Sequence, residues 1–497
     1  MDPKNWTKIR LKKFFHLPAL IWVILLSAFL LRIAWLDKNL FFGYEQGRDL
    51  LAIKDIIFNK NLTLLGPKTD IDGIYHGPLS FYLLIPSFIL TGGNPLLIIV
   101  SLIFVHILSF ILLYKANLEL FGKKVAAISV LLLGISYSSI VYSRWLSNPN
   151  LIPALAIGIF YSLVRAKKKP IFLILCASLW AVIFHLSLLS AATLVAPILF
   201  SLFILKIKLT LKNVALSILA CAILLSSYPV FELRNDFLLS KSVQHLWQTG
   251  DNKSLSIRNI QEFKNEIVDG VFPASRAAAL WLFTFLSALS LWKSFKNKNY
   301  LVPLTFAVFP ALFFLLSGIS PARHAYIETA PFISVVLSCG VAVLLGKKRS
   351  LGFLILAVVA AGNLWSFKER VPQNAGNFLQ NAQSTYLGPE LKMLDFAYKD
   401  AAGTPFNYEY YSIPYWKNEG WRYLFEWYGE KKYGYLPQER ESKVFYLFIE
   451  PDLSQKLYQK NWYEEVNSKS RLIESHNFDR LVVEKRERIP VVSEVEP

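Results

Sequence analysis

Cysteine is scarce in this chain of 497 residues, which contains only Cys176, Cys221 and Cys339. All three lie inside apolar runs, where a free thiol behaves as a small hydrophobic side chain. Three widely separated cysteines supply neither a disulfide framework nor the paired spacing of a zinc site. The sequence also lacks the GxSxG, P-loop, HExxH and GxGxxG fingerprints. Serine hydrolase, P-loop nucleotidase, zinc protease and dinucleotide-binding functions therefore have no support.

Charged residues are also few, at 18%, whereas 54% of the residues are hydrophobic and the mean hydropathy is +0.39. Many long apolar windows indicate a polytopic helical membrane protein. The formal charge of +18 arises largely from short basic clusters between apolar runs, at 8–13, 123–124, 167–169, 206–212, 293–298 and 347–349. Because Lys and Arg in short loops mark the cytoplasmic side, we read this charge as a topology signal and expect no nucleic-acid partner.

The basic clusters predict how the chain crosses the membrane. No small-residue cleavage site follows the first apolar run, so we expect a retained signal-anchor with a cytoplasmic N-terminus. Alternating the clusters predicts about eleven spans, at 17–36, 95–114, 125–142, 151–164, 171–185, 188–205, 214–231, 277–292, 301–317, 326–345 and 351–365. Residues 79–90 are too few for a comfortable span and should form an interfacial helix. An odd number of spans places the C-terminus outside a multi-pass protein of the cell membrane.

Two parts are expected, an all-α transmembrane domain over 1–366 and a soluble extracytoplasmic α/β domain over 367–497. The first includes external loops at 37–78 and 232–275. In the second, charged residues, Pro and Gly become frequent. Spacing predicts helices at 389–401 and 453–460, and strands at 406–412, 443–450 and 481–485. The tail is rich in aromatic residues, including Trp416, Trp421, Trp427, Tyr433 and Tyr435. They could stack on sugar rings, but packing in a core or against the membrane is the favoured interpretation.

The loop 37–78 concentrates charge beside the first span. Its residues of interest are Glu45, Arg48, Asp49 and His76. Charged side chains are costly in hydrocarbon, so this group belongs at the water interface. Apolar residues between 45 and 58 recur at helical spacing, which predicts an amphipathic helix on the membrane surface with Glu45 and Asp49 on its polar side. The alternative is a solvated loop whose acids pair with neighbouring cations.

In this topology, polar residues distant in sequence meet at the outer ends of the spans. Those outside the first loop are Arg144, Asn148, Asn150, His185, Arg323 and His324. A carboxylate among cations suits transfer from a lipid phosphate, because it can take a proton while the cations stabilise the departing phosphate. Structural alternatives stay open: Arg144 as a snorkelling span anchor, His185 as a span-end residue bonded to a carbonyl, and Arg323 with His324 as ordinary loop residues.

Four motifs follow the first span in order: FGYEQGRD, YHGPL, LFGKK and YSRWLSNP. In their order and spacing, residues 17–165 resemble the GT-C superfamily of polytopic glycosyltransferases, in particular the protein mannosyltransferase branch and its lipid A aminoarabinose transferase relatives. The later spans match only in general pattern. The resemblance implies that Glu45 stands where the family's catalytic base is usually Asp, that His76 lies near a phosphate-contacting position, and that Arg144 occupies the Ser-Arg position. It also implies a polyprenyl-phosphate sugar donor and inversion at the anomeric carbon.

This sequence departs from the family where many relatives carry a second acid after the Ser-Arg position, because it has Asn148 and Asn150 there. We expect an inverting glycosyltransferase that moves a hexose or pentose from a polyprenyl phosphate to a hydroxyl or amine of a protein, lipid or glycan on the outer face. The expected site residues are Glu45 and Asp49 (catalytic), Arg144, His76 and Arg48 (donor phosphate), and His185, Asn148, Arg323 and His324 (substrate). No cofactor is implied, and divalent-metal dependence is left open. Alternatives are a lipid or solute transporter, which the interfacial charge disfavours, a glycan-binding scaffold and a polyprenyl-diphosphate-dependent glycan ligase.

Overall fold

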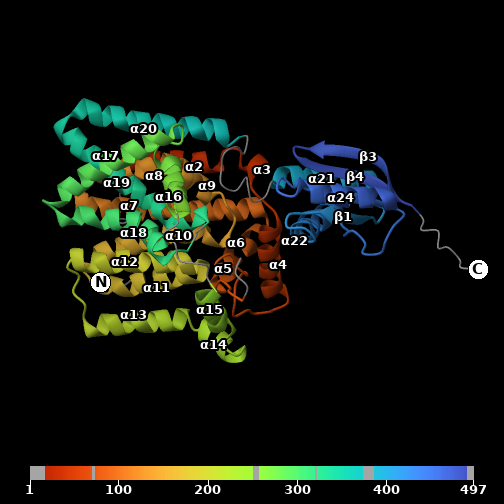
Figure 1. Cartoon of the computed structure of the whole chain (residues 1–497), viewed down its shortest axis with the longest axis horizontal. Coiled ribbons are helices and arrows are strands. Elements are labelled where there is room, and N and C mark those ends of the chain that lie inside the picture. The colour runs from red at the N-terminus through yellow and green to blue at the C-terminus, as the bar shows by residue number, and fades with distance from the viewer. Residues whose placement is uncertain (1–16, 70–72, 250–256, 320–321, 373–384, 490–497) are drawn as a thin grey trace, which may run out of the picture.

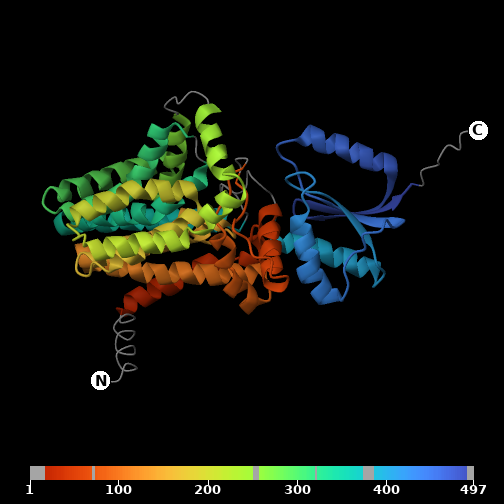
Figure 2. The same ribbon diagram turned by 90° about the horizontal axis from the view of Figure 1, so that it is seen from below.

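A computed structural model describes residues 17–69, 73–249, 257–319, 322–372 and 385–489. It shows a bundle of long helices with a smaller domain against one end (Figure 1). A view turned by 90° shows the same arrangement (Figure 2). The predicted class, a polytopic helical protein with a C-terminal α/β domain, is confirmed.

Long apolar helices form the bundle. They are α2 (Ala19–Ile33), α7 (Pro95–Phe121), α8 (Lys123–Ile135), α9 (Tyr137–Ser143), α10 (Ile152–Ala166), α11 (Phe172–Leu186), α12 (Leu188–Ile204), α13 (Leu211–Leu224), α14 (Ser227–Arg234), α17 (Arg276–Ser294), α18 (Leu301–Ser317), α19 (Ala330–Lys347) and α20 (Arg349–Arg370). Within the described ranges, seven helices are long and apolar enough to cross a membrane, or up to nine if each bent pair is one span. The pairs are α8 with α9, bent by 62°, and α13 with α14, bent by 49°. This is fewer than the eleven crossings expected from the sequence, because two of the expected spans, α11 and α12, form apolar helices of only 15 and 17 residues.

The basic connections lie at the end of the bundle away from the small domain (Figure 1). They join α7 to α8, α10 to α11, α12 to α13, α17 to α18 through η2 (Lys298–Tyr300), and α19 to α20. A shared basic end agrees with the positive-inside rule. Which side this end faces remains a prediction. The basic cluster at 8–13 lies outside the described residues.

Connections at the opposite end fold into shorter helices: α3 (Leu36–Asn39), α4 (Tyr44–Phe58), α5 (Leu79–Tyr82), α6 (Ile85–Thr91), η1 (Asn148–Leu151), α15 (Leu238–Thr249), α16 (Ile257–Val271) and η3 (Arg323–Thr329). The helix predicted over 45–58 is α4, which stands across the bundle direction beside the small domain (Figure 1). The stretch expected as one interfacial helix forms the two short helices α5 and α6, and Pro86 lies in the first turn of α6. Helices α15 and α16 occupy much of 232–275, where the sequence predicts a polar loop.

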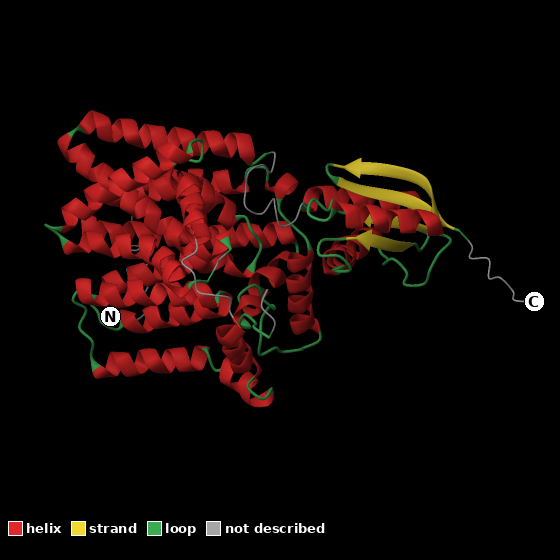
Figure 3. Ribbon diagram, in the orientation of Figure 1, coloured by secondary structure: helices red, strands yellow, loops and turns green. Residues whose placement is uncertain are grey.

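The small domain contains a four-stranded sheet with helices packed on it (Figure 3). Its elements are α21 (Leu387–Ala401), β1 (Asn407–Tyr411), α22 (Glu419–Leu424), η5 (Phe425–Gly429), α23 (Glu430–Tyr433), β2 (Val444–Ile449), α24 (Lys456–Lys469), β3 (Ser470–Phe478) and β4 (Leu481–Arg488). The strand order is β1-β2-β4-β3, with β1 parallel to β2 and the other neighbours antiparallel. Strands β1, β2 and β4 match predicted segments. Strand β3 is an edge strand with mostly exposed side chains, so it lacks the apolar alternation that marks a strand in sequence.

The small domain is held to the bundle through α4. Helix α22 approaches α4 so closely that a side chain at Gly47 would lie 2.3 Å from the backbone oxygen of Glu419. Lys54 on α4 forms an ion pair with Glu426 at 2.7 Å. One hydrophobic core also continues from the bundle into the small domain. Packing on both sides therefore fixes the position of α4.

Candidate active site

Helix α4 carries the predicted residues Glu45, Arg48 and Asp49 in its first two turns. Arg48 pairs with Asp49, since its Nη2 and Nε both lie 2.8 Å from Oδ1 of the carboxylate. Burial lowers the pKa of Arg48, but the charges of Asp49 and Glu45 raise it by more. Burial raises the pKa of Asp49, and Arg48 opposes that shift. The helix therefore presents two carboxylates around one guanidinium.

A small cavity of about 10 Å³ separates α4 from the loop that follows α9. Its lining includes Asp49, Gln46, Ser80, Ser147 and Asn148. Gln46 ties the two walls together, because its Nε2 donates to the carbonyl oxygen of Leu146 at 2.8 Å. The space is about that of a single water molecule. Asp49 thus faces the loop of the YSRWLSNP motif.

His76 lies in the segment between α4 and α5, which returns to the bundle. Its backbone N–H donates to the carbonyl of Pro67 at 2.9 Å. Burial lowers the pKa of His76 to about 4, and the positive charges of Arg48 and His324 add to the effect. His76 is therefore a neutral ring at physiological pH, which can still donate a hydrogen bond. His324 also packs against Trp145, with ring centroids 5.6 Å apart.

His185 supports the turn that contains His76. Its carbonyl oxygen accepts a hydrogen bond from the N–H of Gly77 at 2.8 Å, and its Nε2 lies 2.8 Å from the carbonyl of Leu224. A side chain at Gly77 would lie only 1.8 Å from Nδ1 of His185, so the turn rests directly on the imidazole. His185 therefore lies at the end of α11 beside a backbone carbonyl, as the structural alternative for this residue expects.

Arg144 connects three segments of the bundle. Its Nη1 donates to the carbonyl of Ala34 at 2.9 Å, and its Nη2 bonds to Oδ1 of Asn39. The amide of Asn39 donates in turn to the carbonyl of Val371, just after α20. Arg144 is buried, with 8% of its surface exposed. Its observed contacts are those of an anchor, and the expected phosphate contact remains a prediction.

Asn148 and Asn150 hold the loop that follows α9. Asn150 donates from Nδ2 to the carbonyls of Tyr142 and Trp145, at 3.1 and 2.7 Å. Its Oδ1 lies 3.1 Å from Nε2 of the buried His106. Asn148 donates to the carbonyl of Leu186 at the end of α11, at 2.7 Å. Both amides therefore shape the loop.

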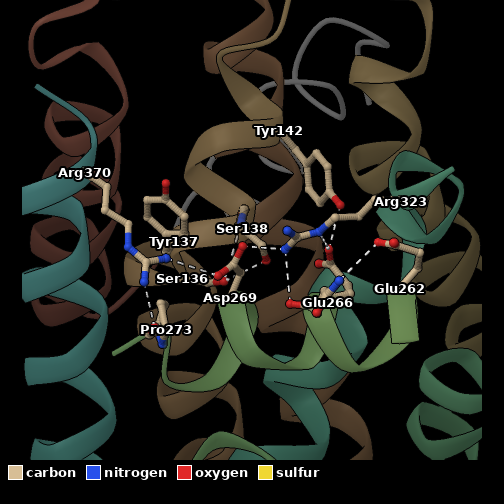
Figure 4. A network of polar contacts seen from close by, with 12 residues as sticks. Ser136, Tyr137, Ser138, Tyr142, Glu262, Glu266, Asp269, Pro273, Arg323 and Arg370 are labelled. Atoms are coloured by element: carbon tan, nitrogen blue, oxygen red, sulfur yellow. Dashed lines mark hydrogen bonds and ion pairs between the residues drawn. The ribbon is translucent and has the colours of Figure 1, made fainter. Parts of the chain in front are cut away.

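A buried network on α16 contains residues that the sequence analysis does not identify (Figure 4). Glu266 accepts a hydrogen bond from the hydroxyl of Tyr142 at 2.6 Å. Asp269 pairs with Arg323 and lies 3.5 Å from Nη1 of Arg370. Acids at positions 262, 266 and 269 have helical spacing, which is the signal that could have identified them. The predicted substrate residue Arg323 thus belongs to this network.

Three of the predicted residues, Glu45, Arg48 and Asp49, share the first two turns of α4. Together with His76, on which the charges of Arg48 and His324 act, and with His324 itself, we call them the α4 cluster. Arg144, Asn148 and His185 hold the surrounding loops. Among the described residues, no group of three or more His, Cys, Asp or Glu side chains could hold a metal ion.

No family model and no curated protein matches this sequence. Among solved structures, the fold is similar to ArnT from Cupriavidus metallidurans bound to undecaprenyl phosphate, with 12% identity, a TM-score of 0.61, and coverage of 97% of this chain and 100% of that chain. The apo state of the same ArnT gives 10% identity, a TM-score of 0.62, and coverage of 94% and 97%. An Archaeoglobus fulgidus oligosaccharyltransferase gives 13% identity, a TM-score of 0.49, and coverage of 86% and 65%. The likeness to ArnT confirms the predicted GT-C-like fold.

Proposed function

We propose that this protein is an inverting membrane glycosyltransferase, which moves one sugar from a polyprenyl phosphate to a hydroxyl or amine acceptor on the outer face of the membrane. The observation that carries the proposal is the α4 cluster, in which carboxylates, a guanidinium and a neutral histidine meet at one end of the bundle. The ArnT of similar fold is bound to undecaprenyl phosphate, which supports a polyprenyl phosphate as the donor.

The reaction proposed for the cluster is a single displacement. The acceptor oxygen or nitrogen attacks the anomeric carbon as the bond from that carbon to the phosphate oxygen breaks. Glu45 takes the proton from the acceptor, and Asp49 orients Arg48 through their ion pair. Arg48 and His76 bind the phosphate as its charge grows.

The other predicted residues already have protein partners, so we propose positioning roles for them. Arg144 and Asn148 fix the loop opposite Asp49, and His185 fixes the turn that presents His76. Arg323 fixes α16 over the bundle through Asp269. Such supporting contacts matter because catalytic groups work only within narrow limits of geometry.

The direct test uses the full chain in phospholipid nanodiscs. Lipids that purify with the protein are identified by mass spectrometry, and radiolabelled polyprenyl-phosphate sugars are then supplied as donors. We expect release of the free polyprenyl phosphate together with a labelled acceptor. Use of polyprenyl-diphosphate donors alone would establish the ligase alternative, and lipid movement without sugar transfer would establish a transporter.

A further inference from the structure

An exposed group of aromatic side chains on the small domain has no part in the site described above. Trp416 is 70% exposed and Tyr458 is 45% exposed. Tyr415 lies between them, with ring centroids 5.4 Å from Trp416 and 5.1 Å from Tyr458. Behind it, Tyr411 packs on Tyr415 at 5.3 Å and on Trp462 at 4.8 Å. We call these five residues the aromatic platform.

The loop 412–418 holds Trp416 outward. Trp416 has φ of 58°, in the left-handed region that a large side chain rarely adopts. Its carbonyl oxygen accepts a hydrogen bond from the hydroxyl of Tyr410 at 3.3 Å, and Ser412 bonds to the carbonyl of Lys417. The loop thus holds an aromatic side chain exposed to solvent, although large apolar side chains are usually buried. Residues held in such rare conformations concentrate at ligand-binding sites.

Lys417 joins the platform to α4. Its Nζ lies 5.5 Å from the centroid of the Tyr44 ring, and Arg48 covers the same ring at 5.4 Å. Tyr44 immediately precedes Glu45 in the first turn of α4. A continuous chain of contacts therefore runs from Trp416 to the α4 cluster. A molecule bound on the platform would lie next to the candidate active site.

The chemistry of the platform fits a sugar ring. One side of a pyranose carries C–H groups, which the negative face of an aromatic ring attracts, while its edge carries hydroxyls. The hydroxyls of Tyr415 and Tyr458, which bond to each other, provide hydrogen-bonding groups near the exposed Trp416 ring, and the ammonium of the next residue, Lys417, lies over Tyr44. We propose that the aromatic platform binds a saccharide, and that this saccharide is part of the glycan that accepts the transferred sugar. The second half of this proposal rests on the proposed function, whereas the first half does not.

A membrane contact is the competing explanation, because Trp and Tyr also collect at membrane interfaces. The surroundings of the platform favour the saccharide. Helix α24, which supplies Tyr458 and Trp462, exposes Leu457 beside Tyr458, but it also carries the ion pairs Lys460–Glu464 and Glu465–Lys469 on its exposed surface. A helix lying on lipid would instead present a continuous apolar face.

The test is saccharide binding to the full chain in phospholipid nanodiscs, free of sugar-headed detergents. The probes are hexasaccharides of mannose, glucose and N-acetylglucosamine, followed by saturation-transfer NMR and calorimetry. At least one probe should bind, and Trp416→Ala and Tyr458→Ala should each weaken it roughly three- to tenfold. Trp281→Ala, which removes a 74% exposed tryptophan from α17, should change nothing.

Three results would overturn the proposal: no probe binds the parental protein, Trp416→Ala binds as well as the parent, or spin-labelled lipid quenches the fluorescence that Trp416→Phe removes. Transfer assays separate this proposal from the proposed function. Saccharide binding without any transferase activity would retain the platform and refute the enzyme. Transfer with an acceptor KM that Trp416→Ala leaves unchanged would retain the enzyme and refute the platform as the acceptor site.

Discussion

Arg144 illustrates how a single side chain can connect several segments of the bundle. Its Nη1 donates to the carbonyl of Ala34 and its Nη2 donates to Oδ1 of Asn39, whereas a lysine has only one nitrogen for both acceptors. We expect Arg144→Lys to lower both the transfer rate and the unfolding temperature, and Arg144→Ala to lower them further, because each hydrogen bond to a charged group contributes about 1.5–3 kcal/mol. Initial rates and thermal unfolding of the same preparations check this. Near-parental values in both variants would show that the anchor is dispensable.

His76 makes stability depend on pH. Its pKa is about 4 in the folded protein because of burial and the charges of Arg48 and His324, whereas an unfolded histidine titrates near pH ~6.5. A depressed folded pKa means that the contribution to stability is complete above about pH 6.5 and is lost as the pH falls toward 4. We expect His76→Gln to flatten the fall of the unfolding temperature over this window. Identical slopes in parent and variant would contradict the assignment.

The sequence singles out some residues of the candidate site and of the buried network but not others, for physical reasons. Charge is so rare near the spans that Glu45, Arg48 and Asp49 stand out. Glu266 and Asp269 lie in a segment that is polar anyway, and their partner Arg323 is about 54 residues away in the chain. Only tertiary structure brings those groups together.

At the scale of elements, the contact between α4 and α22 has no space for an added methyl group. A Cβ at Gly47 would lie 2.3 Å from the Glu419 oxygen, which belongs to the backbone and cannot rotate away. Overpacking of this kind typically costs about 1–3 kcal/mol. We expect Gly47→Ala to lower the unfolding temperature and to slow transfer by displacing α4. The matched control is Gly346→Ala, where a Cβ would meet nothing within 4 Å, and equal effects of the two changes would refute the account.

Elements whose apolar residues recur with a helical or strand period could be predicted from the sequence. Elements that are stabilised by contacts with distant segments could not. Helices α4 and α21 bury one face and show helical spacing in the sequence. Strand β3 is mostly exposed, and the charged residues of α16 are buried through ion pairs rather than apolar packing. The close contact between α4 and α22 depends on Gly47 and on Gly420, where a Cβ would lie 3.1 Å from the backbone of Gly43, and these roles appear only when the helices meet.

At the scale of the whole molecule, the basic connections and the small domain lie at opposite ends of the bundle. We expect single cysteines, in a background without the natural ones, to react with an impermeant reagent in intact cells when placed at the exposed Leu453 of the small domain. Cysteines at Lys168 or Lys348 should stay unlabelled. Labelling at Lys168 and Lys348, together with protection at Leu453, would show that the orientation is the reverse of the one proposed.

The apolar runs could be recognised from composition, because each of them has to be buried in lipid or protein, but the described residues form seven to nine candidate spans rather than eleven. The placement of the small domain against α4 could not be recognised in this way, since it depends on side-chain fit between distant segments. That placement matters for the proposed acceptor site, because Lys417, which follows Trp416 of the aromatic platform, lies over Tyr44 of α4.

The central claim, that Glu45 is the general base of a sugar transfer, is tested most directly by single-turnover transfer and donor affinity measured on purified Glu45→Gln. The amide keeps the shape but cannot accept the proton, so transfer should fall by about 10²–10⁴-fold. Donor affinity should persist, because Arg48 and His76 hold the phosphate. Glu45→Asp should be milder, and Asp55→Asn, a change to an exposed acid of the same helix, should have little effect. Parental transfer by Glu45→Gln, or joint loss of folding and donor binding, would contradict the account.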